Sequence, residues 1–410
     1  MKENHLITPL PIFDSMEYLE FQNDFSYLET GYQLRDIKIA IEFLKSYRGS
    51  LGTFNSYRRE IERLLHWCAL IAKTTLKKLK RNDIESFIEF CLKPPKKWIG
   101  KTKPPRFIIK DGNRIPNAEW RPFIVTVSKS EHKQGETPKI KNFELTQGSL
   151  KELFAIVSSF FNYMLQEEYV FMNPVALIRQ KSKFIRKNQG QPKIRRLSEL
   201  QWQTVIDVAK KLAEKNPDVH ERTLFVMSVL YSMYLRISEL TASTRWTPKM
   251  NDFARDSDEN WWFTTVGKGN KERQIAVSDA TLKALKRWRK HLHLSLLPSP
   301  ADDSPLLPKT KGVGPIKSGN FIRKIVQHCF DQAVNQLHVD GLSEEADTLI
   351  EATVHWLRHT GISDDVKTRP REHVRDDAGH SSSAITDKYI DIEKRERHRS
   401  AKKKQISESD

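Results

Sequence analysis

The segment His355-Trp356-Leu357-Arg358-His359-Thr360, with the short motifs that follow it, is the most informative part of this chain. Gly379-His380 comes next, and Tyr389 lies nine positions beyond His380. Tyr389 is the last tyrosine in the sequence, and no other tyrosine occurs after Tyr234. At positions i and i+3, His355 and Arg358 share one face of a helix. A lone tyrosine downstream of histidines and an arginine suggests covalent attack on a phosphate.

The charge of the chain indicates the kind of partner it binds. A net charge of +17 over 410 residues and a pI of about 9.6 are expected of a protein whose partner carries many phosphates. Charge alone does not separate DNA from RNA, and a basic but otherwise ordinary protein is the alternative. The proportions of hydrophobic residues (38%) and charged residues (30%) fit a soluble, folded protein.

Several classes of protein are disfavoured by what the sequence lacks. It has no run of eighteen apolar residues and no apolar segment at the N-terminus, so we expect neither a membrane span nor a secretory signal. Cys68, Cys91 and Cys329 are widely spaced and indicate neither a disulfide framework nor a metal cluster. We therefore expect a reduced, cytoplasmic protein without a metal site.

The sequence predicts two domains in a mainly α fold with a small antiparallel β-hairpin. Their boundaries are set by one polar, very basic stretch that we interpret as a linker. The predicted parts are a poorly structured N-terminal arm (1–30), a helical domain (31–182) with an insertion at about 94–146, the basic linker (183–197), a second domain (198–395) and a charged tail (396–410). Ser198-Glu199-Leu200-Gln201 is a capping-box pattern and predicts the first helix of the second domain.

In the first domain, apolar residues recur at helical spacing between Tyr57 and Cys68. Arg58, Arg59 and Arg63 lie off that stripe. They belong either to a solvated helix face or to a set of contacts with DNA phosphates. The insertion contains a β-rich run, Phe123 to Val127, and suggests a short hairpin; it either contacts DNA or serves packing or assembly.

The second domain carries four weak signals that become strong in combination. They are Arg236 with Glu239 after an apolar helix, the Gly267-Lys268-Gly269 turn of a predicted hairpin, the His355–His359 box, and His380 with Tyr389. Each alone has an ordinary structural explanation, such as a surface arginine, a solvated turn or a packed histidine. Together they supply what phosphodiester cleavage needs, because guanidinium groups stabilise the negative charge of a pentacoordinate phosphate while a hydroxyl attacks it. A lysine can protonate the leaving oxygen, and a tyrosine between two arginines is expected to have a pKa below 10.

In these motifs the second domain resembles the catalytic domain of the tyrosine recombinases, the phage integrase family. The resemblance rests on Arg236-Ile-Ser-Glu-Leu240, the Gly-Lys-Gly hairpin, the His-x-Leu-Arg-His-Thr box, and Gly-His followed by Tyr389. It extends more loosely to residues 53–68 and 150–178, which are similar to the family's helical core-binding domain. It implies a two-domain architecture on double-stranded DNA, assembly as a tetramer with the same or a partner recombinase, accessory proteins in some systems, and no metal or nucleotide cofactor.

The resemblance also implies a role for each motif residue. Arg236 and Arg358 would clamp the scissile phosphate, Lys268 would protonate the 5′ oxygen, and Tyr389 would form a 3′-phosphotyrosyl bond. His355 would assist in proton transfer and His380 would hydrogen-bond the phosphate. Glu239 and His359 would support the site without touching substrate. Lys271 and Arg273 would bind backbone phosphates.

The chain departs from the family pattern between His359 and His380. Residues 360–378 are far more polar than the usual apolar helix pair, and Pro370 predicts a break or a helix start there. Three functions remain open: a site-specific recombinase that acts as the integrase or transposase of a mobile element, a type IB topoisomerase-like enzyme, or a non-catalytic DNA-binding accessory protein.

Overall fold

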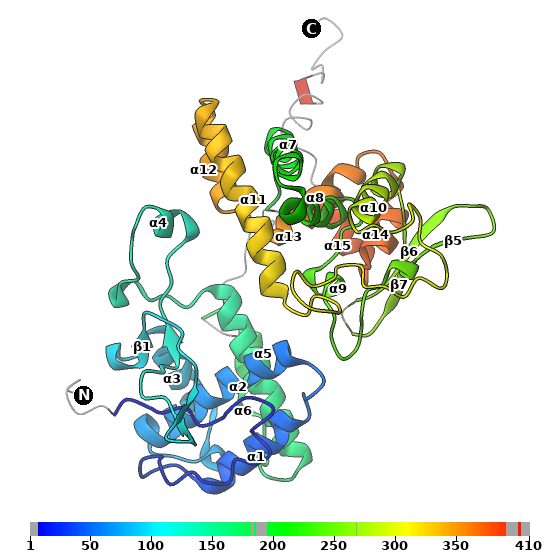
Figure 1. The fold of residues 1–410 in the computed structure, drawn as a ribbon. Coiled ribbons are helices and arrows are strands. Elements are labelled where there is room, and N and C mark those ends of the chain that lie inside the picture. Colours follow the sequence, from blue (N-terminus) through cyan, green and yellow to red (C-terminus); the bar gives the residue numbers. More distant parts are fainter. Residues whose placement is uncertain (1–6, 182–183, 186–194, 268, 391–400, 403–410) are drawn as a thin grey trace, which may run out of the picture. The chain divides into compact units, whose positions relative to one another are not determined.

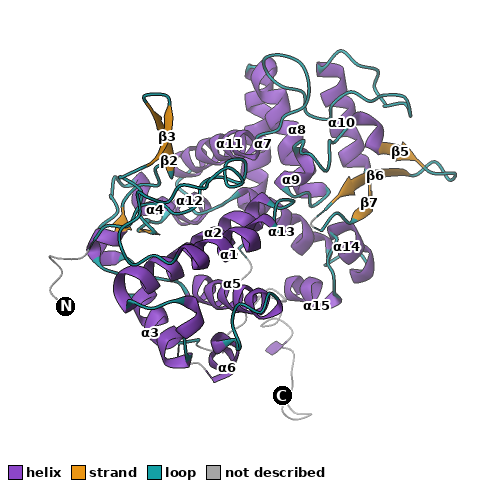
Figure 2. Ribbon diagram, turned by 90° about the horizontal axis from the view of Figure 1, so that it is seen from below, coloured by secondary structure: helices purple, strands orange, loops and turns teal. Residues whose placement is uncertain are grey.

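The computed structural model describes residues 7–181, 184–185, 195–267, 269–390 and 401–402. The chain divides into two compact units, residues 1–191 and 192–410, and the boundary falls within the predicted basic linker. Both units are mainly helical with small sheets, as the sequence predicted (Figures 1 and 2). Among the described helices, none is long and apolar enough to cross a membrane.

The first unit is a helical bundle with a β-rich insertion. Its core is formed by apolar faces of α1, α2 and α5, and α3 and α6 complete the bundle. The helices are α1 (Leu34–Lys45), α2 (Leu51–His66), α3 (Arg81–Leu92), α4 (Lys129–Lys133), α5 (Gln147–Gln166) and α6 (Pro174–Lys181), with short helical turns η2 (Trp67–Ala72), η3 (Leu76–Lys78), η4 (Lys96–Trp98) and η5 (Ile140–Asn142). The strands are β1 (Ile99–Gly100), β2 (Phe107–Lys110), β3 (Asn113–Pro116) and β4 (Phe123–Ile124).

Residues 7–30 do not form the poorly structured arm that the sequence led us to expect. Ile12, Phe13 and Leu19 are buried in the core of the first unit. The carboxylate of Glu62, on α2, accepts the backbone N–H groups of Ile12 (2.6 Å) and Phe13 (3.2 Å). A buried charged acceptor thus satisfies two amides that would otherwise be desolvated without partners. The segment is therefore an integral part of the fold.

The insertion contains a hairpin, but at a different place from the predicted one. β2 pairs antiparallel with β3, whereas the β-rich run contributes only β4, which pairs in parallel with β1 in the register Ile99↔Phe123. Trp98, Trp120 and Phe123 are buried. Arg63 of α2 donates to the Pro122 carbonyl at 2.8 and 3.0 Å, so the insertion covers the polar face of α2.

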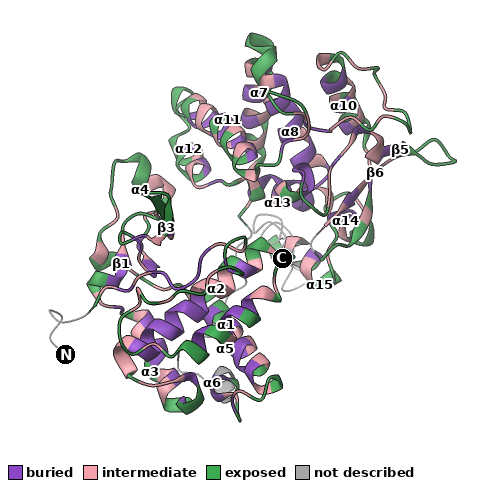
Figure 3. Cartoon of the chain, turned by 60° about the horizontal axis from the view of Figure 1, so that its bottom comes forward, coloured by how far each residue is buried: buried purple, intermediate pink, exposed green. Residues whose placement is uncertain are grey.

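The second unit is built around one buried helix, α8, which contacts α7, α10, α11 and α13 (Figure 3). Its helices are α7 (Glu199–Lys215), α8 (Pro217–Ser232), α9 (Ile237–Leu240), α10 (Asp279–His291), α11 (Gly319–Val339), α12 (Ser343–Ile350), α13 (Val354–Asp365), α14 (Arg371–Ala378) and α15 (Ser383–Thr386), with the turns η6 (Met250–Asp252) and η7 (Asp387–Ile390). The predicted capping box is present at α7, where the Ser198 hydroxyl accepts the N–H of Gln201 at 3.1 Å. The last residues of the predicted linker belong to this unit, since Leu197 is buried and its N–H bonds to Thr360.

A three-stranded antiparallel sheet, β5 (Phe253–Arg255), β6 (Trp261–Val266) and β7 (Glu272–Ala276), lies at one side of this unit. The predicted hairpin is its β6–β7 pair, with the register Phe263↔Ile275, and β5 is an additional strand. The polar stretch 360–378 forms the end of α13, a turn, and α14, which starts directly after Pro370 as the sequence suggested. Gly361 allows α13 to approach α8 closely, because a Cβ there would lie 2.0 Å from the Tyr231 carbonyl oxygen.

Candidate active site

Arg236 and Glu239 are held together by the first turn of α9. The Glu239 carboxylate accepts the backbone N–H of Arg236 at 2.8 Å and its Nη1 at 3.1 Å. Glu239 is fully buried, whereas the Arg236 side chain is 29% exposed. The short helix therefore orients a guanidinium that still has donors available to a ligand.

Arg273, on β7, is a structural partner of this pair. Its Nη1 and Nη2 donate to the two Glu239 oxygens at 2.7 and 2.9 Å, and its Nε donates to the Asp377 carbonyl at 3.0 Å. Burial tends to raise the pKa of Glu239, but the bonds from Arg273 and the charge of Arg236 outweigh it and lower that pKa. The Arg273 side chain is only 10% exposed, and three of its five N–H groups are bonded within the protein. The structure therefore favours a role in holding Glu239 over the expected contact with backbone phosphates.

The hairpin turn lies next to the Glu239 cluster. A Cβ on Gly267 would come within 3.0 Å of Arg273 Nη1 and 3.2 Å of Glu239 Oε1, so glycine allows the strand to pass close to the ion pairs. The turn is closed by a bond from the Gly267 N–H to the Lys271 carbonyl at 2.8 Å, and the Lys271 side chain is exposed. Lys268, the predicted general acid, lies outside the described residues.

Arg358 is the buried arginine of the site. Its side chain donates to the backbone carbonyls of Tyr234 and Ala378, the latter at 2.6 Å. Burial, followed by the nearby charge of Arg236, lowers its pKa to about 9. Tyr234 has a φ of 52°, an uncommon conformation for a residue other than glycine, and its carbonyl is one of the two acceptors for Arg358. The Arg358 guanidinium thus holds together the segment that follows α8 and the C-terminal end of α14.

Two histidines contact Tyr389, and a third packs against one of them. His355 and His359 lie one helical turn apart on α13, with ring centres 4.5 Å apart in an edge-to-face arrangement. Gly379, with a φ of 62°, ends α14 and turns the chain so that the His380 ring stacks on Tyr389 at 5.7 Å. His380 Nδ1 bonds to the Thr386 hydroxyl at 2.9 Å.

These histidines are predominantly neutral at pH 7. Burial and neighbouring cationic groups lower the pKa of His359 and of His380 to about 4 each. Desolvation and the charges of Arg358 and Arg236 also lower the pKa of His355. A neutral imidazole has one donor nitrogen and one acceptor nitrogen, so each ring can take up a proton when a phosphate brings negative charge nearby.

Tyr389, in η7, lies in the site of its own chain. Its hydroxyl is 2.5 Å from His359 Nδ1, and the two ring centres are 5.4 Å apart. The pKa of Tyr389 is raised, because burial outweighs the charges of Arg358 and Arg236. The expected lowering of this pKa was therefore wrong for the ligand-free chain. His359, predicted only as a support, is the residue that contacts the tyrosine hydroxyl.

A second polar cluster, which the sequence did not identify, anchors the same loops. The Tyr234 hydroxyl bonds to Asp365, and Arg369 donates to that hydroxyl at 3.0 Å and to Asp377 at 2.6 Å. Asp377 precedes Ala378 and also accepts the N–H of Ala276 on β7. Arg369 therefore links the two segments whose carbonyls hold Arg358. The unusual polarity of residues 360–378 was the available signal, and these ion pairs account for three of its charged residues, Asp365, Arg369 and Asp377.

The three arginines of α2 differ in availability. Arg63 is buried, bonded to Glu60 at 2.9 Å and stacked over the Phe123 ring at 4.3 Å, so the structure corrects its expected role in DNA contact. Arg58 donates to the Asp14 carbonyl and to Asn55, and burial lowers its pKa to about 10. Arg59 is 41% exposed and paired with Glu60 and Glu152. Of the three, Arg59 is the one whose guanidinium is most accessible.

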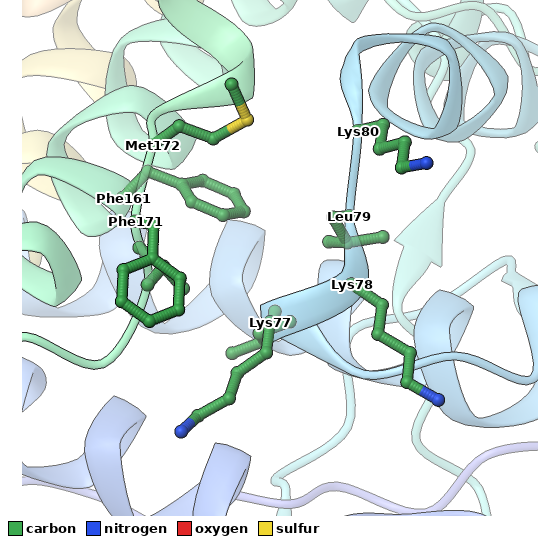
Figure 4. A pocket seen from close by; sticks show the side chains of 9 residues that line it. Lys77, Lys78, Leu79, Lys80, Phe161, Phe171 and Met172 are labelled. Atoms are coloured by element: carbon green, nitrogen blue, oxygen red, sulfur yellow. The ribbon is translucent and has the colours of Figure 1, made fainter.

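The first unit has a surface cavity of about 450 Å³ between η3 and the segment that joins α5 to α6 (Figure 4). Lys77, Lys78 and Lys80 lie along one side, and the exposed Phe171 and Met172 lie along the other. None of the nine residues that line the cavity is an acid, a histidine, a cysteine or a tyrosine. The cavity therefore offers lysines without a carboxylate, imidazole, thiol or phenol to pair with them, and the chemistry is assigned to the second unit.

Comparisons with known proteins identify relatives of this chain. Residues 195–396 match the model of the phage integrase family. The chain is 25% identical over 290 residues to tyrosine recombinase XerC of Xanthomonas campestris pv. campestris (strain B100), covering 69% of this chain and 72% of the relative. It is 27% identical over 161 residues to tyrosine recombinase XerC of Shewanella amazonensis, covering 39% and 44% of the two chains.

Two solved structures share the fold at low sequence identity. The XerH site-specific recombinase bound to a palindromic difH substrate, in a post-cleavage complex, gives a TM-score of 0.54 at 15% identity and covers 97% of each chain. The Tn1549 transposon integrase in complex with transposon right end DNA gives a TM-score of 0.50 at 13% identity and covers 88% of this chain and 98% of the integrase chain. These likenesses support the two-domain architecture.

Proposed function

The chain belongs to the phage integrase family of tyrosine recombinases, and on that premise we propose that it cleaves and rejoins DNA at specific sites through a 3′-phosphotyrosyl intermediate, as the recombinase of a mobile element. The observation that carries the proposal is the position of Tyr389. Its hydroxyl lies 2.5 Å from His359 Nδ1, its ring stacks on His380, and the charges of Arg358 and Arg236 act on it. A nucleophile, a proton acceptor and two guanidinium groups are the parts that phosphodiester transfer needs.

In the proposed reaction, Arg236 binds the non-bridging phosphate oxygens, and Arg358 stabilises their negative charge. Arg236 offers exposed donors, and Arg358 contributes positive charge from beneath the site. Guanidinium groups bind such oxygens by charge-assisted bonds that strengthen as negative charge develops in the pentacoordinate state. His355 and His380 are further donors to the phosphate, and Lys268 remains the proposed acid for the 5′ leaving oxygen. Since these groups supply the positive charge, we propose that cleavage needs no metal ion and proceeds in the presence of EDTA.

The raised pKa of Tyr389 fits a site that waits for its substrate. Without DNA the hydroxyl keeps its proton, which suppresses reaction with adventitious electrophiles. A phosphate bound between Arg236 and Arg358 brings the reacting atoms together and replaces water around the ring. We propose that the protein acts as a tetramer on two duplexes, the assembly implied by the family resemblance.

The test uses nicked duplexes with the sequence of the DNA that flanks the gene. After cleavage, the short strand that carries the free 5′ hydroxyl diffuses away, so the covalent complex does not rejoin and accumulates. The chain is expected to form a protein–DNA adduct that survives denaturation and disappears on protease treatment. Tyr389→Phe should form no adduct, whereas Tyr231→Phe, which removes a hydroxyl bonded to Asp364 elsewhere in the same unit, should form it. Adduct formation by Tyr389→Phe would overturn the assignment of the nucleophile.

The product distinguishes a recombinase from the two alternatives. Paired intact sites are expected to give Holliday junctions and exchanged strands. Relaxed circles without junctions would indicate a topoisomerase-like enzyme, and tight binding without any adduct would indicate an accessory protein.

A further inference from the structure

The best-defined contact of the Tyr389 hydroxyl is with His359, whereas the resemblance assigns proton transfer to His355. Within the described part of the chain, the hydrogen bond of the Tyr389 hydroxyl goes to Nδ1 of His359 at 2.5 Å. His355 instead presents its ring to His359, edge to face, and is exposed to solvent. The Nδ1 atom of His380 is engaged with Thr386. The geometry therefore separates the roles of the three histidines.

The position of His359 on α13 explains this contact. Arg358, the preceding residue, turns inward to the carbonyls of Tyr234 and Ala378. His359 is one position further round the helix and faces η7, so its ring and the Tyr389 ring lie tilted at 36°. Because Arg358 is fixed at two carbonyls, α13 has little freedom to rotate, and the His359 ring is presented at a defined place.

From this geometry we infer that His359 accepts the proton of Tyr389 when the tyrosine attacks the scissile phosphate. The inference rests on the proposed function and adds a catalytic residue to it. It assigns to His359 a contact with a reacting atom, where the resemblance implied only support.

The step balances as follows. The Tyr389 O–H bond breaks and its proton moves to His359 Nδ1, while the phenolic oxygen forms a bond to phosphorus. The P–O5′ bond breaks, and its electron pair leaves with the 5′ oxygen, which takes a proton from the acid of the site. In the rejoining step the 5′ hydroxyl returns its proton to the deprotonated acid of the site and attacks phosphorus. The P–O bond to Tyr389 breaks, and the tyrosine oxygen recovers its proton from His359.

The charges around His359 suit a transient acceptor. His355 and Arg358 on its own helix disfavour the imidazolium, as does burial. From the segments that face it, Tyr389 and His380 are neutral, and Arg236 adds positive charge to the site. A bound phosphodiester, which gains a further negative charge in the pentacoordinate state, reverses this balance and favours the imidazolium. Proton transfer is therefore coupled to the presence of substrate.

The first test compares two substitutions at one position. His359→Asn places an amide near the former Nδ1 and keeps a hydrogen-bond acceptor, but the amide does not take up a proton; His359→Leu keeps neither. If His359 accepts the proton, both variants should lose on the order of 100-fold in cleavage rate at pH 7. Their rates should rise with pH as solvent takes the proton, while DNA affinity stays unchanged. Recovery of the wild-type rate by His359→Asn would show a positioning role and overturn the inference.

The second test locates the proton. A substrate with sulfur in place of the bridging 5′ oxygen has a leaving group that needs no acid. It should therefore restore the cleavage rate of variants that lack the general acid, but not the rate of His359→Asn. A fluorinated tyrosine at position 389, with a more acidic hydroxyl, should partly restore His359→Asn at pH 7. The inference would be contradicted if the sulfur substrate restored the cleavage rate of His359→Asn, or if the fluorinated tyrosine left that rate unchanged.

His355→Asn is the matched control on the same helix. It is expected to slow cleavage without the shift of the pH profile and without a response to the fluorinated tyrosine. If His355→Asn shows both signatures and His359→Asn shows neither, His355 is the acceptor. Loss of adduct in Tyr389→Phe together with wild-type behaviour of His359→Asn would refute this inference and leave the proposed function standing.

Discussion

Two buried glutamates, one in each unit, pair with arginines to different effect. Glu62 is 1% exposed; it bonds to Arg106 and to the backbone amides of Ile12 and Phe13. All of these partners lie within the first unit, and the Arg106 side chain is only 16% exposed. Glu239 is fully buried and bonds to Arg273, which is buried, and to Arg236, which is 29% exposed.

The difference lies in what each carboxylate leaves available. Every partner of Glu62 is committed to the fold, so its ion pair joins segments that are distant in the sequence. Glu239 joins segments too, but it also fixes the direction of a guanidinium with donors open to solvent. A buried pair is weak evidence for stability, because desolvation offsets much of its attraction. A buried carboxylate that orients an exposed arginine is better evidence for a binding site.

The largest expected effect separates these two glutamates. Glu239→Gln keeps the shape but removes the charge that holds Arg273 and Arg236, and cleavage of a nicked site should fall on the order of 100-fold. DNA affinity should change little, because many other phosphate contacts carry binding. Both quantities can be measured on one labelled duplex, by adduct formation and by titration at fixed salt.

Glu62→Gln is the matched control in the first unit. It leaves the Arg106 guanidinium without its charged partner and should lower the free energy of unfolding by about 3 kcal/mol. At a temperature where the variant is folded, the cleavage rate should stay near wild type. If Glu62→Gln impaired cleavage as much as Glu239→Gln, the contrast between the two carboxylates would fail.

One buried histidine and two half-buried ones give a second contrast, in their response to pH. His66 in the first unit is fully buried, with Nδ1 bonded to Tyr32, and its pKa is lowered to about 3. His359 and His380 have a pKa of about 4. The unfolded chain protonates each ring near pH 6.5. Between that pH and the folded-state pKa, the unfolded state binds more protons. Stability is therefore lost as pH falls through this window.

DNA should distinguish the two kinds of histidine. A phosphate in the site brings negative charge to His359 and His380 but not to His66. DNA should therefore raise the pKa of His359 and of His380 by at least about one unit. The measurement is an NMR titration of the histidine ring protons, with and without a short duplex. An equal shift at His66, or none at His380, would contradict the assignment of the phosphate site.

The sequence predicted the elements that carry the motif residues, because those elements follow from residue types at fixed spacing. His355, Arg358 and His359 share a helix, and the predicted hairpin is the β6–β7 pair. The capping box of α7 followed from capping chemistry alone. Local rules suffice where the relevant neighbours lie within a few residues.

What the sequence did not reveal depends on neighbours distant in the chain. Arg63 was read as a free cation because Pro122, its buried acceptor, lies in an insertion whose course was unknown. Arg273 was read as a phosphate ligand because its partner Glu239 lies in another element. The direction of the pKa shift of Tyr389 depends on how deeply the ring is buried, which charge counting does not give.

The smallest expected effect concerns the arginines of α2. Arg59 is 41% exposed and pairs with the exposed Glu152 and with Glu60, which is 2% exposed and also bonded to Arg63. Exchange of the exposed Glu152 pair for a DNA phosphate costs little. If Arg59 contacts the backbone, Arg59→Ala should weaken binding by a few-fold and reduce the slope of log affinity against log salt by about one. Arg63→Ala should leave that slope unchanged and lower stability instead, because Arg63 is committed to Glu60 and Pro122. Measuring affinity at several salt concentrations, with thermal unfolding beside it, tests both outcomes. A reduced slope in Arg63→Ala would mean that the insertion opens on DNA and that α2 presents its polar face after all.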